Sequence, residues 1–251
     1  MVNLGKITKD GKAIYLAYDH GLEHGPVDFS EESVNPNYIL DIAQAAGFQG
    51  VVLQKGVAEK YYTGTKYARL IPLILKLNGK TSFITQEPYS PQICQVDEAV
   101  KLGAAAVGYT VYVGSGRQDL MFAEFSKIVR EAHNIGLPVI GWMYPRGSTI
   151  AKETPEITAY AARIGLELGA DVVKVKYTGS AKSFSWVVKS ARPVRVLMSG
   201  GERESLANFL QAVREVMEAG GAGVAVGRNV WQSEDPIGVS KTLTGIVFGR
   251  V

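Results

Sequence analysis

Cysteine is almost absent from this chain of 251 residues, in which Cys94 is the sole example. One thiol cannot form an intramolecular disulfide, and it cannot build a cysteine-rich metal site. Long apolar runs are missing too, because none approaches the roughly 20 residues that a membrane-spanning helix needs. The first residues also lack the apolar core of a secretory signal. We therefore expect a cytoplasmic protein with no membrane partner.

An excess of charge of either sign is lacking as well. The formal net charge is +3, and charged residues make up 20% of the chain. This mild basic balance suits anionic small molecules, but it falls short of a surface that binds nucleic acid. We expect no nucleic-acid partner.

Short β-branched apolar runs alternate with longer helical patterns along the chain, as in βα units around a parallel sheet. The predicted strands lie at residues 13–18, 50–53, 72–77, 105–110, 138–144, 172–177, 194–198 and 223–226. The predicted helices lie at residues 37–46, 57–61, 96–102, 118–134, 155–168, 183–190, 205–219 and 236–247. The segment 81–95 is long for a βα connection and contains two prolines, so we expect an ordered excursion over the barrel rim.

Eight regular units and this chain length predict one α/β domain over residues 1–251, a (β/α)8 TIM barrel with a parallel eight-stranded sheet. A doubly wound open sheet would also alternate strands and helices. The regular eightfold repetition favours the closed barrel. In such a barrel, polar residues at the carboxyl ends of the strands face one shared pocket.

Two lysines mark the sixth predicted strand. The strand period of two sends Val172, Lys174 and Lys176 into the barrel, so that two amines share one apolar environment. Desolvation and like-charge repulsion both disfavour the ammonium form, and a neutral amine can form an imine with a carbonyl. The alternative is a pair of structural lysines bonded to carboxylates or to a bound phosphate. Lys76 on the third strand is a competing inward lysine.

The fifth strand ends in alternating Trp142, Tyr144 and Arg146, which share one side if the chain stays extended. Pro145 favours that extended geometry for Tyr144. A phenol near an ammonium has a lowered pKa and can shuttle protons, while Trp142 could form a wall against a sugar. An aromatic core cluster with Arg146 in an ion pair at the rim explains the segment equally well.

The first strand leads into a loop rich in ionisable groups. Asp19 is in register with the inward Ala17, so its carboxylate could orient a substrate hydroxyl or act as a base. The alternative is a structural role in which Asp19 caps the loop through backbone N–H groups.

His20, Glu23 and His24 in the same loop raise the question of a metal site. The loop is broken by glycines, and the third histidine of the chain, His133, lies on a predicted helix. A zinc site with three protein ligands would need distant carboxylates. We expect no metal, and we expect His20 and His24 to contact the substrate instead.

The last two strands end in small residues at the place where barrels commonly bind phosphate. Ser199, Gly200 and Gly201 follow the seventh strand, and Gly227 and Arg228 follow the eighth. Exposed backbone N–H groups in such turns can surround a phosphate, and the guanidinium adds a charged fork. These five residues predict a phosphate-binding site.

Together these segments resemble the archaeal-type class I fructose-bisphosphate aldolases, also called the DhnA-type family. The residues that carry the resemblance are 17–26, 142–147, 174–179, 183–186, 198–201 and 226–231. The resemblance implies a barrel that cleaves fructose 1,6-bisphosphate reversibly to dihydroxyacetone phosphate and glyceraldehyde 3-phosphate through a lysine imine, with no metal or other cofactor. Relatives form large rings, so it also implies a homo-oligomer, of which a decamer is one form.

Position by position, the resemblance implies that Lys174 is the Schiff-base lysine and Tyr144 the proton donor. It implies substrate contacts at Asp19, His24, Trp142, Arg146 and Lys176, and a phosphate site at Ser199, Gly200, Gly201, Gly227 and Arg228. Our hypothesis is that Lys174 attacks the C2 carbonyl and Tyr144 relays protons. Asp19 then orients the hydroxyl whose deprotonation breaks the C3–C4 bond.

Three alternatives stay open from the sequence. A related Schiff-base enzyme, such as an aminodeoxyheptulosonate synthase of aromatic biosynthesis, would share the barrel and the lysine and use another acceptor. A non-catalytic sugar-phosphate sensor would bind the ligand without turnover. A metal-dependent aldolase would lose activity to a chelator.

Overall fold

The computed structural model describes residues 2–201 and 205–249, and its strands close into a barrel. The strands are β1 (Ala13–Ala17), β2 (Gly50–Gln54), β3 (Leu73–Lys76), β4 (Ala104–Val113), β5 (Val139–Pro145), β6 (Val172–Val175), β7 (Arg195–Ser199) and β8 (Gly223–Val226). Neighbouring strands pair in parallel and in chain order, and β1 pairs with β8 to complete the ring. The predicted TIM barrel is confirmed.

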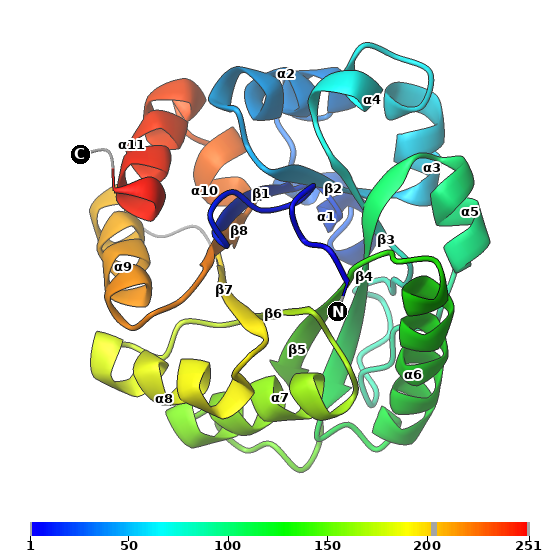
Figure 1. The fold of residues 1–251 in the computed structure, drawn as a ribbon, viewed down its shortest axis with the longest axis vertical. Helices are drawn as coiled ribbons and strands as arrows, with labels where there is room; N and C mark the ends of the chain where they lie inside the picture. The colour runs from blue at the N-terminus through cyan, green and yellow to red at the C-terminus, as the bar shows by residue number, and fades with distance from the viewer. Residues whose placement is uncertain (1, 202–204, 250–251) are drawn as a thin grey trace.

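Among the described residues, seven longer helices form the outer layer around the sheet (Figure 1). They are α2 (Pro36–Ala46), α5 (Val96–Lys101), α6 (Gln118–Asn134), α7 (Pro155–Glu167), α8 (Ala181–Ala191), α9 (Leu206–Glu218) and α11 (Pro236–Phe248). Side chains that accept a backbone N–H begin five of them, at Asn35, Thr154, Ser180, Ser205 and Asp235. Such caps satisfy donors that the first helical turn leaves free.

The predicted helix at residues 57–61 is broken into short turns. The chain forms α3 (Lys55–Val57), the π-helical turn η2 (Ala58–Tyr62) and α4 (Tyr67–Leu70). Three further short helices were not predicted: α1 (His20–Glu23) and η1 (Pro26–Asp28) after β1, and α10 (Arg228–Trp231) after β8. Periodicity over three to five residues is too short to register as a helix. All three lie beside the pocket described below.

Alternation along each strand divides the core into two layers. On β1, Ile14 and Leu16 face the helices, whereas Tyr15 and Ala17 belong to the cluster inside the barrel. The N-terminal segment lies across the barrel in Figure 1, and Ile7 is fully buried in the inner cluster, where its carbonyl accepts a hydrogen bond from the Tyr15 hydroxyl at 2.9 Å. The amino-terminal end of the barrel is therefore filled, and a pocket can form at the other end.

The sixth strand is shorter than predicted. It ends at Val175, so Lys176 and Tyr177 lie beyond the strand and not on its inward face. The other strands agree with the predicted ranges to within a few residues, and β4 extends further than expected, to Val113. Because β6 ends early, the surroundings of Lys176 differ from those of Lys174.

The excursion at residues 81–95 packs over the rim and is held by polar contacts. Glu87 accepts hydrogen bonds from the backbone N–H groups of Gly116 at 2.9 Å and Ser148 at 3.0 Å, which joins the loops after β3, β4 and β5.

None of the helices within the described ranges has both the length and the apolarity to span a bilayer.

The buried Asn78 fastens the start of this excursion to β4. Its amide nitrogen donates to the carbonyls of Ser90 at 2.8 Å and Thr110 at 2.9 Å, and its amide oxygen accepts from the Thr110 N–H at 2.8 Å. We expect Asn78→Ala to lower the free energy of unfolding by about 2 to 5 kcal/mol, because it leaves buried backbone groups without partners. Equilibrium denaturant unfolding measures this loss. The exposed Asn208→Ala on α9 should change stability by no more than about 0.5 kcal/mol, and an equal loss in both variants would contradict the role given to Asn78.

Candidate active site

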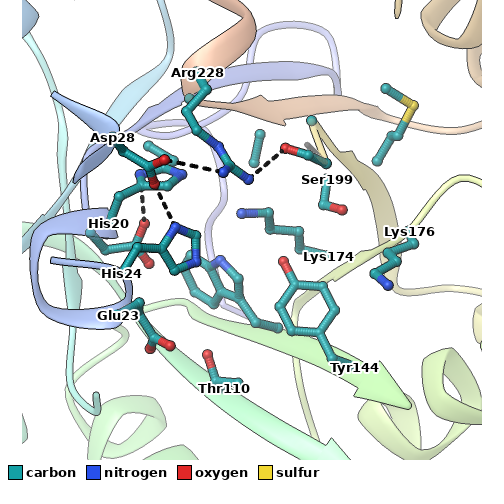
Figure 2. A pocket seen from close by; sticks show the side chains of 18 of the residues that line it. His20, Glu23, His24, Asp28, Thr110, Tyr144, Lys174, Lys176, Ser199 and Arg228 are labelled. Atoms are coloured by element: carbon teal, nitrogen blue, oxygen red, sulfur yellow. Dashed lines mark hydrogen bonds and ion pairs between the residues drawn. The ribbon is translucent and has the colours of Figure 1, made fainter. Parts of the chain in front are cut away.

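A pocket of about 730 Å³ opens at the carboxyl ends of the barrel strands. Every residue that the sequence proposed for catalysis or binding lines it, and Figure 2 shows Lys174, Tyr144 and Arg228 directed toward a common space. The full set is Asp19, His20, His24, Trp142, Tyr144, Arg146, Lys174, Lys176, Ser199, Gly200, Gly201, Gly227 and Arg228. Because the strands are parallel and tilted around one axis, residues far apart in the chain meet at this end.

Lys174 lies on β6 and is only 7% exposed. Its Nζ is 5.4 Å from the centroid of the Trp142 ring, on the neighbouring strand β5. Desolvation lowers the pKa of Lys174, although Asp19 and Glu23 act in the opposite direction. A larger share of this amine is therefore neutral than for an exposed lysine, which is the form that attacks a carbonyl.

Lys176 does not share the environment of Lys174, and that prediction is wrong. Because β6 ends before it, the side chain of Lys176 is 42% exposed, and its Nζ lies 2.7 Å from a carboxylate oxygen of Glu153. The second buried lysine is Lys76 on β3, which is 1% exposed and whose Nζ also lies 5.4 Å from the Trp142 ring. Burial, and not repulsion from Lys176, lowers the pKa of Lys174.

Tyr144, at the end of β5, also differs from expectation. Burial, together with the nearby charge of Asp19, raises the pKa of Tyr144, and these effects outweigh Lys76 and Arg146, which act to lower it. The expected lowering is wrong, because the carboxylate and the dry surroundings disfavour a phenolate. Near neutral pH the phenol is protonated and can donate a proton.

Asp19 is buried, and its Oδ2 lies 3.4 Å from Nζ of Lys76. Burial alone would raise the pKa of this carboxyl, but the neighbouring charges, Lys76 foremost, outweigh it and lower the pKa of Asp19 to about 2. Asp19 directly precedes α1, yet its side chain makes no capping hydrogen bond there. The carboxylate is thus ionised and aimed at the lysines, which argues against the structural alternative of a loop cap.

The two histidines of the first loop have different surroundings. Burial lowers the pKa of His20 to about 4, so its ring is neutral near neutral pH. Within the described part of the chain, Nδ1 of His20 has no hydrogen-bond partner and is buried. His24 is more exposed, and its Nδ1 lies 2.6 Å from Oδ2 of Asp28. In residues 2–201 and 205–249, no group of three or more histidine, cysteine or acidic side chains is placed to hold a metal ion.

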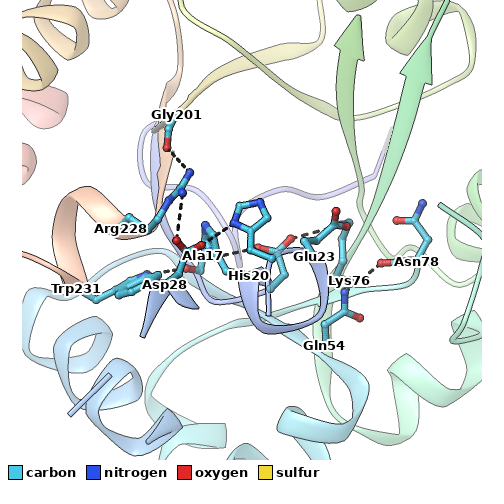
Figure 3. A network of polar contacts seen from close by, with 12 residues as sticks. Ala17, His20, Glu23, Asp28, Gln54, Lys76, Asn78, Gly201, Arg228 and Trp231 are labelled. Carbon is cyan, nitrogen blue, oxygen red and sulfur yellow. Dashed lines mark hydrogen bonds and ion pairs between the residues drawn. The ribbon is translucent and has the colours of Figure 1, made fainter. Parts of the chain in front are cut away.

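The predicted phosphate site gathers around Arg228. Its guanidinium lies 3.4 Å from Oδ1 of Asp28 and donates to the carbonyl of Gly201 at 3.2 Å, so it joins the loops after β1, β7 and β8 (Figure 3). Gly201 has a φ of 66°, a conformation that suits glycine. At Gly227, a Cβ atom would lie 2.4 Å from Cε1 of His20. The site needs glycine there because the histidine ring approaches the backbone so closely.

Two charged residues of the pocket, Glu23 and Asp28, were not assigned a role there from the sequence, and Lys76 was named only as a competing inward lysine. Lys76 carried a signal, because a lysine inside the apolar run of β3 requires a buried partner. Glu23 had been considered only as a metal ligand. Asp28 gave no signal, since α1 and η1 turn it back toward Arg228 and neither short helix was predicted.

Comparison with known proteins identifies close relatives. A model of the DeoC/LacD family aldolases matches residues 13–233. The class 1 fructose-bisphosphate aldolase of Thermoproteus tenax is 55% identical over 246 residues, which cover 96% of this chain and 92% of that protein. The enzyme of the same name from Halobacterium salinarum is 44% identical over 245 residues, with the same coverage of 96% and 92%.

Solved structures agree with these matches. An archaeal fructose-1,6-bisphosphate aldolase, with its catalytic lysine covalently bound to the carbinolamine intermediate of the substrate, is 52% identical with a TM-score of 0.93, and the match covers 98% of each chain. A Schiff-base-forming fructose-1,6-bisphosphate aldolase studied through its reaction intermediates is 53% identical with the same TM-score of 0.93, covering 97% of this chain and 98% of that one.

The depressed pKa of Asp19 predicts a pH-dependent contribution to stability. Since the folded value of about 2 lies below the ordinary 3.8, the stabilisation is fully present above about pH 4 and is lost as the pH falls toward 2. We expect the stability difference between the wild type and Asp19→Asn to shrink by about 2 kcal/mol over this range. Denaturant unfolding at a series of pH values measures it. Asp119→Asn, an exposed change on α6, should follow the wild type throughout, and a difference for Asp19→Asn that does not vary with pH would refute the assignment.

Proposed function

Because the chain belongs to the DeoC/LacD family of aldolases, and within it to the Schiff-base class I fructose-bisphosphate aldolases, we propose that it cleaves fructose 1,6-bisphosphate reversibly to dihydroxyacetone phosphate and glyceraldehyde 3-phosphate through an imine on Lys174. The observation that carries the assignment to this residue is a buried lysine of lowered pKa at the end of β6, in one pocket with a protonated tyrosine and an ionised aspartate. Enzymes of this class hold the intermediate on a lysine and use no metal.

The first half of the reaction forms the imine. The neutral amine of Lys174 attacks the C2 carbonyl and gives a carbinolamine. Tyr144, whose raised pKa keeps its proton in place, donates that proton to the C2 oxygen, which leaves as water. The product is a protonated imine, which can accept an electron pair from the neighbouring carbon bond.

The second half breaks the C3–C4 bond. Asp19 orients the C4 hydroxyl, and the Tyr144 phenolate left by the first half takes the proton of that hydroxyl. The C4 oxygen becomes the aldehyde oxygen of glyceraldehyde 3-phosphate, while the bonding pair of C3–C4 moves into the imine and gives an enamine. Tyr144 relays a proton to C3 of the enamine. Water then hydrolyses the imine, which releases dihydroxyacetone phosphate and restores the Lys174 amine.

The basic and small residues of the pocket bind the anionic ends of the substrate. Ser199, Gly200, Gly201, Gly227 and Arg228 form a site for one phosphate, in which backbone N–H groups and a guanidinium meet. His20, His24, Trp142, Arg146 and Lys176 contact the rest of the sugar. Their positions around one pocket support these roles.

Trapping with borohydride tests the imine. We expect incubation with fructose 1,6-bisphosphate and borohydride, with a chelator present, to add one triose phosphate per chain, and peptide mapping to place it on Lys174. Lys174→Ala should lose the label and lower kcat by a factor on the order of 10⁴ or more, because the covalent route is removed. Lys55→Ala, at a lysine on α3 outside the pocket, is the control. It should leave both the labelling of Lys174 and kcat unchanged. Normal cleavage by Lys174→Ala, or a label on another residue, would refute the assignment to Lys174. Analysis of the products formed with other aldehydes identifies the acceptor.

The chain also assembles, we propose, as a ring-shaped homo-oligomer. The resemblance implies this state, and two large aromatic side chains on neighbouring outer helices support it: Tyr160 on α7 is 65% exposed and Trp186 on α8 is 59% exposed. Exposed aromatic patches of this kind are typical of protein interfaces.

A single catalytic domain and a cytoplasmic location stay predictions from the sequence.

Native mass spectrometry tests the assembly. We expect the wild type to have several times the mass of one chain, and Trp186→Ala with Tyr160→Ala to shift the population toward smaller species. A wild-type protein that stays monomeric at micromolar concentration would contradict the proposal.

A further inference from the structure

Glu23 and Lys76 have no part in the reaction as written, although both line its pocket. Lys76 projects from β3, and its Nζ lies 3.7 Å from Oε1 of Glu23 (Figure 3). The same Nζ lies 3.4 Å from Oδ2 of Asp19. The other oxygen of Glu23 accepts a hydrogen bond from the Tyr112 hydroxyl at 3.4 Å. An ammonium buried this deeply requires nearby opposite charges, and the two carboxylates supply them.

The charges around Lys174 can be counted from these contacts. Asp19 and Glu23 are the carboxylates that act on the Lys174 amine. Together they carry two negative charges, and Lys76 cancels one of them. A neutral Lys174 amine therefore faces one net negative charge, and the protonated imine that forms from it brings the sum to zero.

We propose, on the basis of the imine mechanism above, that Lys76 and Glu23 are positioning residues that set this charge balance: Lys76 cancels one carboxylate charge so that Lys174 can lose its proton, and the remaining charge stabilises the cationic imine. With Lys76 absent, two negative charges would hold Lys174 as an unreactive ammonium. With Glu23 absent, no net negative charge would remain to favour the imine.

The other ionisable groups of the pocket leave this count unchanged. His20 is neutral and Tyr144 is protonated near neutral pH. The guanidinium of Arg146 lies over the rings of Tyr112 and Tyr144, at 5.8 Å and 5.7 Å. Among the described residues it forms no ion pair with Asp19 or Glu23, whereas Lys76 pairs with both.

Arg228 and Lys176 are each paired with a carboxylate of their own. Arg228 lies against Asp28, and Lys176 lies against Glu153. The charge that faces the reacting amine therefore comes from Asp19, Glu23 and Lys76.

The indole of Trp142 belongs to the same arrangement. Its ring lies 5.4 Å from Nζ of both Lys76 and Lys174, within the range of cation–π attraction. The ring can lie there because β4 carries Gly108 beside it, where a Cβ atom would come within 1.9 Å of the indole. The same aromatic ring thus lies close both to the Lys76 cation and to the Lys174 amine that must become a cation.

The test is the pH dependence of kcat/KM and of borohydride trapping in the full-length enzyme, with fructose 1,6-bisphosphate as substrate. For Lys76→Met we expect the acid limb of both profiles to move to higher pH by about one unit or more, a tenfold change in the neutral fraction per unit. Activity should recover toward the wild-type level at high pH. For Glu23→Gln the acid limb should move to lower pH, and less imine should be trapped at saturating substrate.

The double variant Lys76→Met with Glu23→Gln gives the sharpest outcome. It removes one charge of each sign, so that Asp19 alone faces Lys174 and the net charge is again minus one. We expect its acid limb to return to within a few tenths of a pH unit of the wild type. If the pair had a purely structural role, the losses of activity in the two single variants would instead add together in the double variant. Lys55→Met, outside the pocket, is the control and should leave both profiles unchanged.

Several outcomes would overturn the proposal. They are an unmoved acid limb in Lys76→Met, an equal loss of activity at every pH, and a double variant that is displaced further than Lys76→Met alone. If Lys76→Met does not fold, Glu23→Gln still decides, because an acid limb that stays in place or moves to higher pH contradicts the charge count. Failure of the imine mechanism itself is a separate result, since it would show as an unlabelled Lys174 in the wild type.

Discussion

The burial of the Asp19 carboxylate between cations is the interaction on which the rest of the pocket depends. Its ionised state follows from the neighbouring positive charges, Lys76 at 3.4 Å foremost, which outweigh the cost of desolvation. Burial, together with the ionised Asp19, keeps the proton on Tyr144. For Lys174, desolvation lowers the pKa and favours the neutral amine, whereas the neighbouring carboxylates raise the pKa and favour the ammonium. The protonation states of these three side chains, one from the loop after β1 and two from β5 and β6, therefore depend on one another.

The backbone sets the other half of the site. The phosphate site is a meeting of three loops around Arg228, and its shape depends on positions that lack side chains: Gly227 makes room for His20, and Gly201 adopts a backbone conformation that suits glycine. Gly108 does the same for Trp142 on the catalytic side. Charged groups supply the chemistry here, while glycines decide how closely the rings and the backbone approach one another.

The sequence predicted the barrel and the membership of the pocket, because strand periodicity and the parallel order of βα units determine which residues reach the carboxyl ends. It could not predict where β6 ends, and that one detail removes Lys176 from the apolar environment it was expected to share with Lys174. Nor could it predict the direction of the Tyr144 pKa shift, which depends on burial and on a carboxylate more than one hundred positions away in the chain. Asp28 and Glu23 were missed for a related reason, since short helices turn them inward.

The filled amino-terminal end of the barrel has a kinetic consequence. Ile7 and its neighbours fill that end, so the pocket opens at the carboxyl ends of the strands. Substrate and both products pass through that end of the barrel. During cleavage the three-carbon aldehyde has to depart while the other half is still bonded to Lys174, and in condensation the ketone has to enter before the aldehyde. The architecture therefore imposes an ordered sequence of release and entry, in which the aldehyde exchanges with solvent from a covalently occupied enzyme.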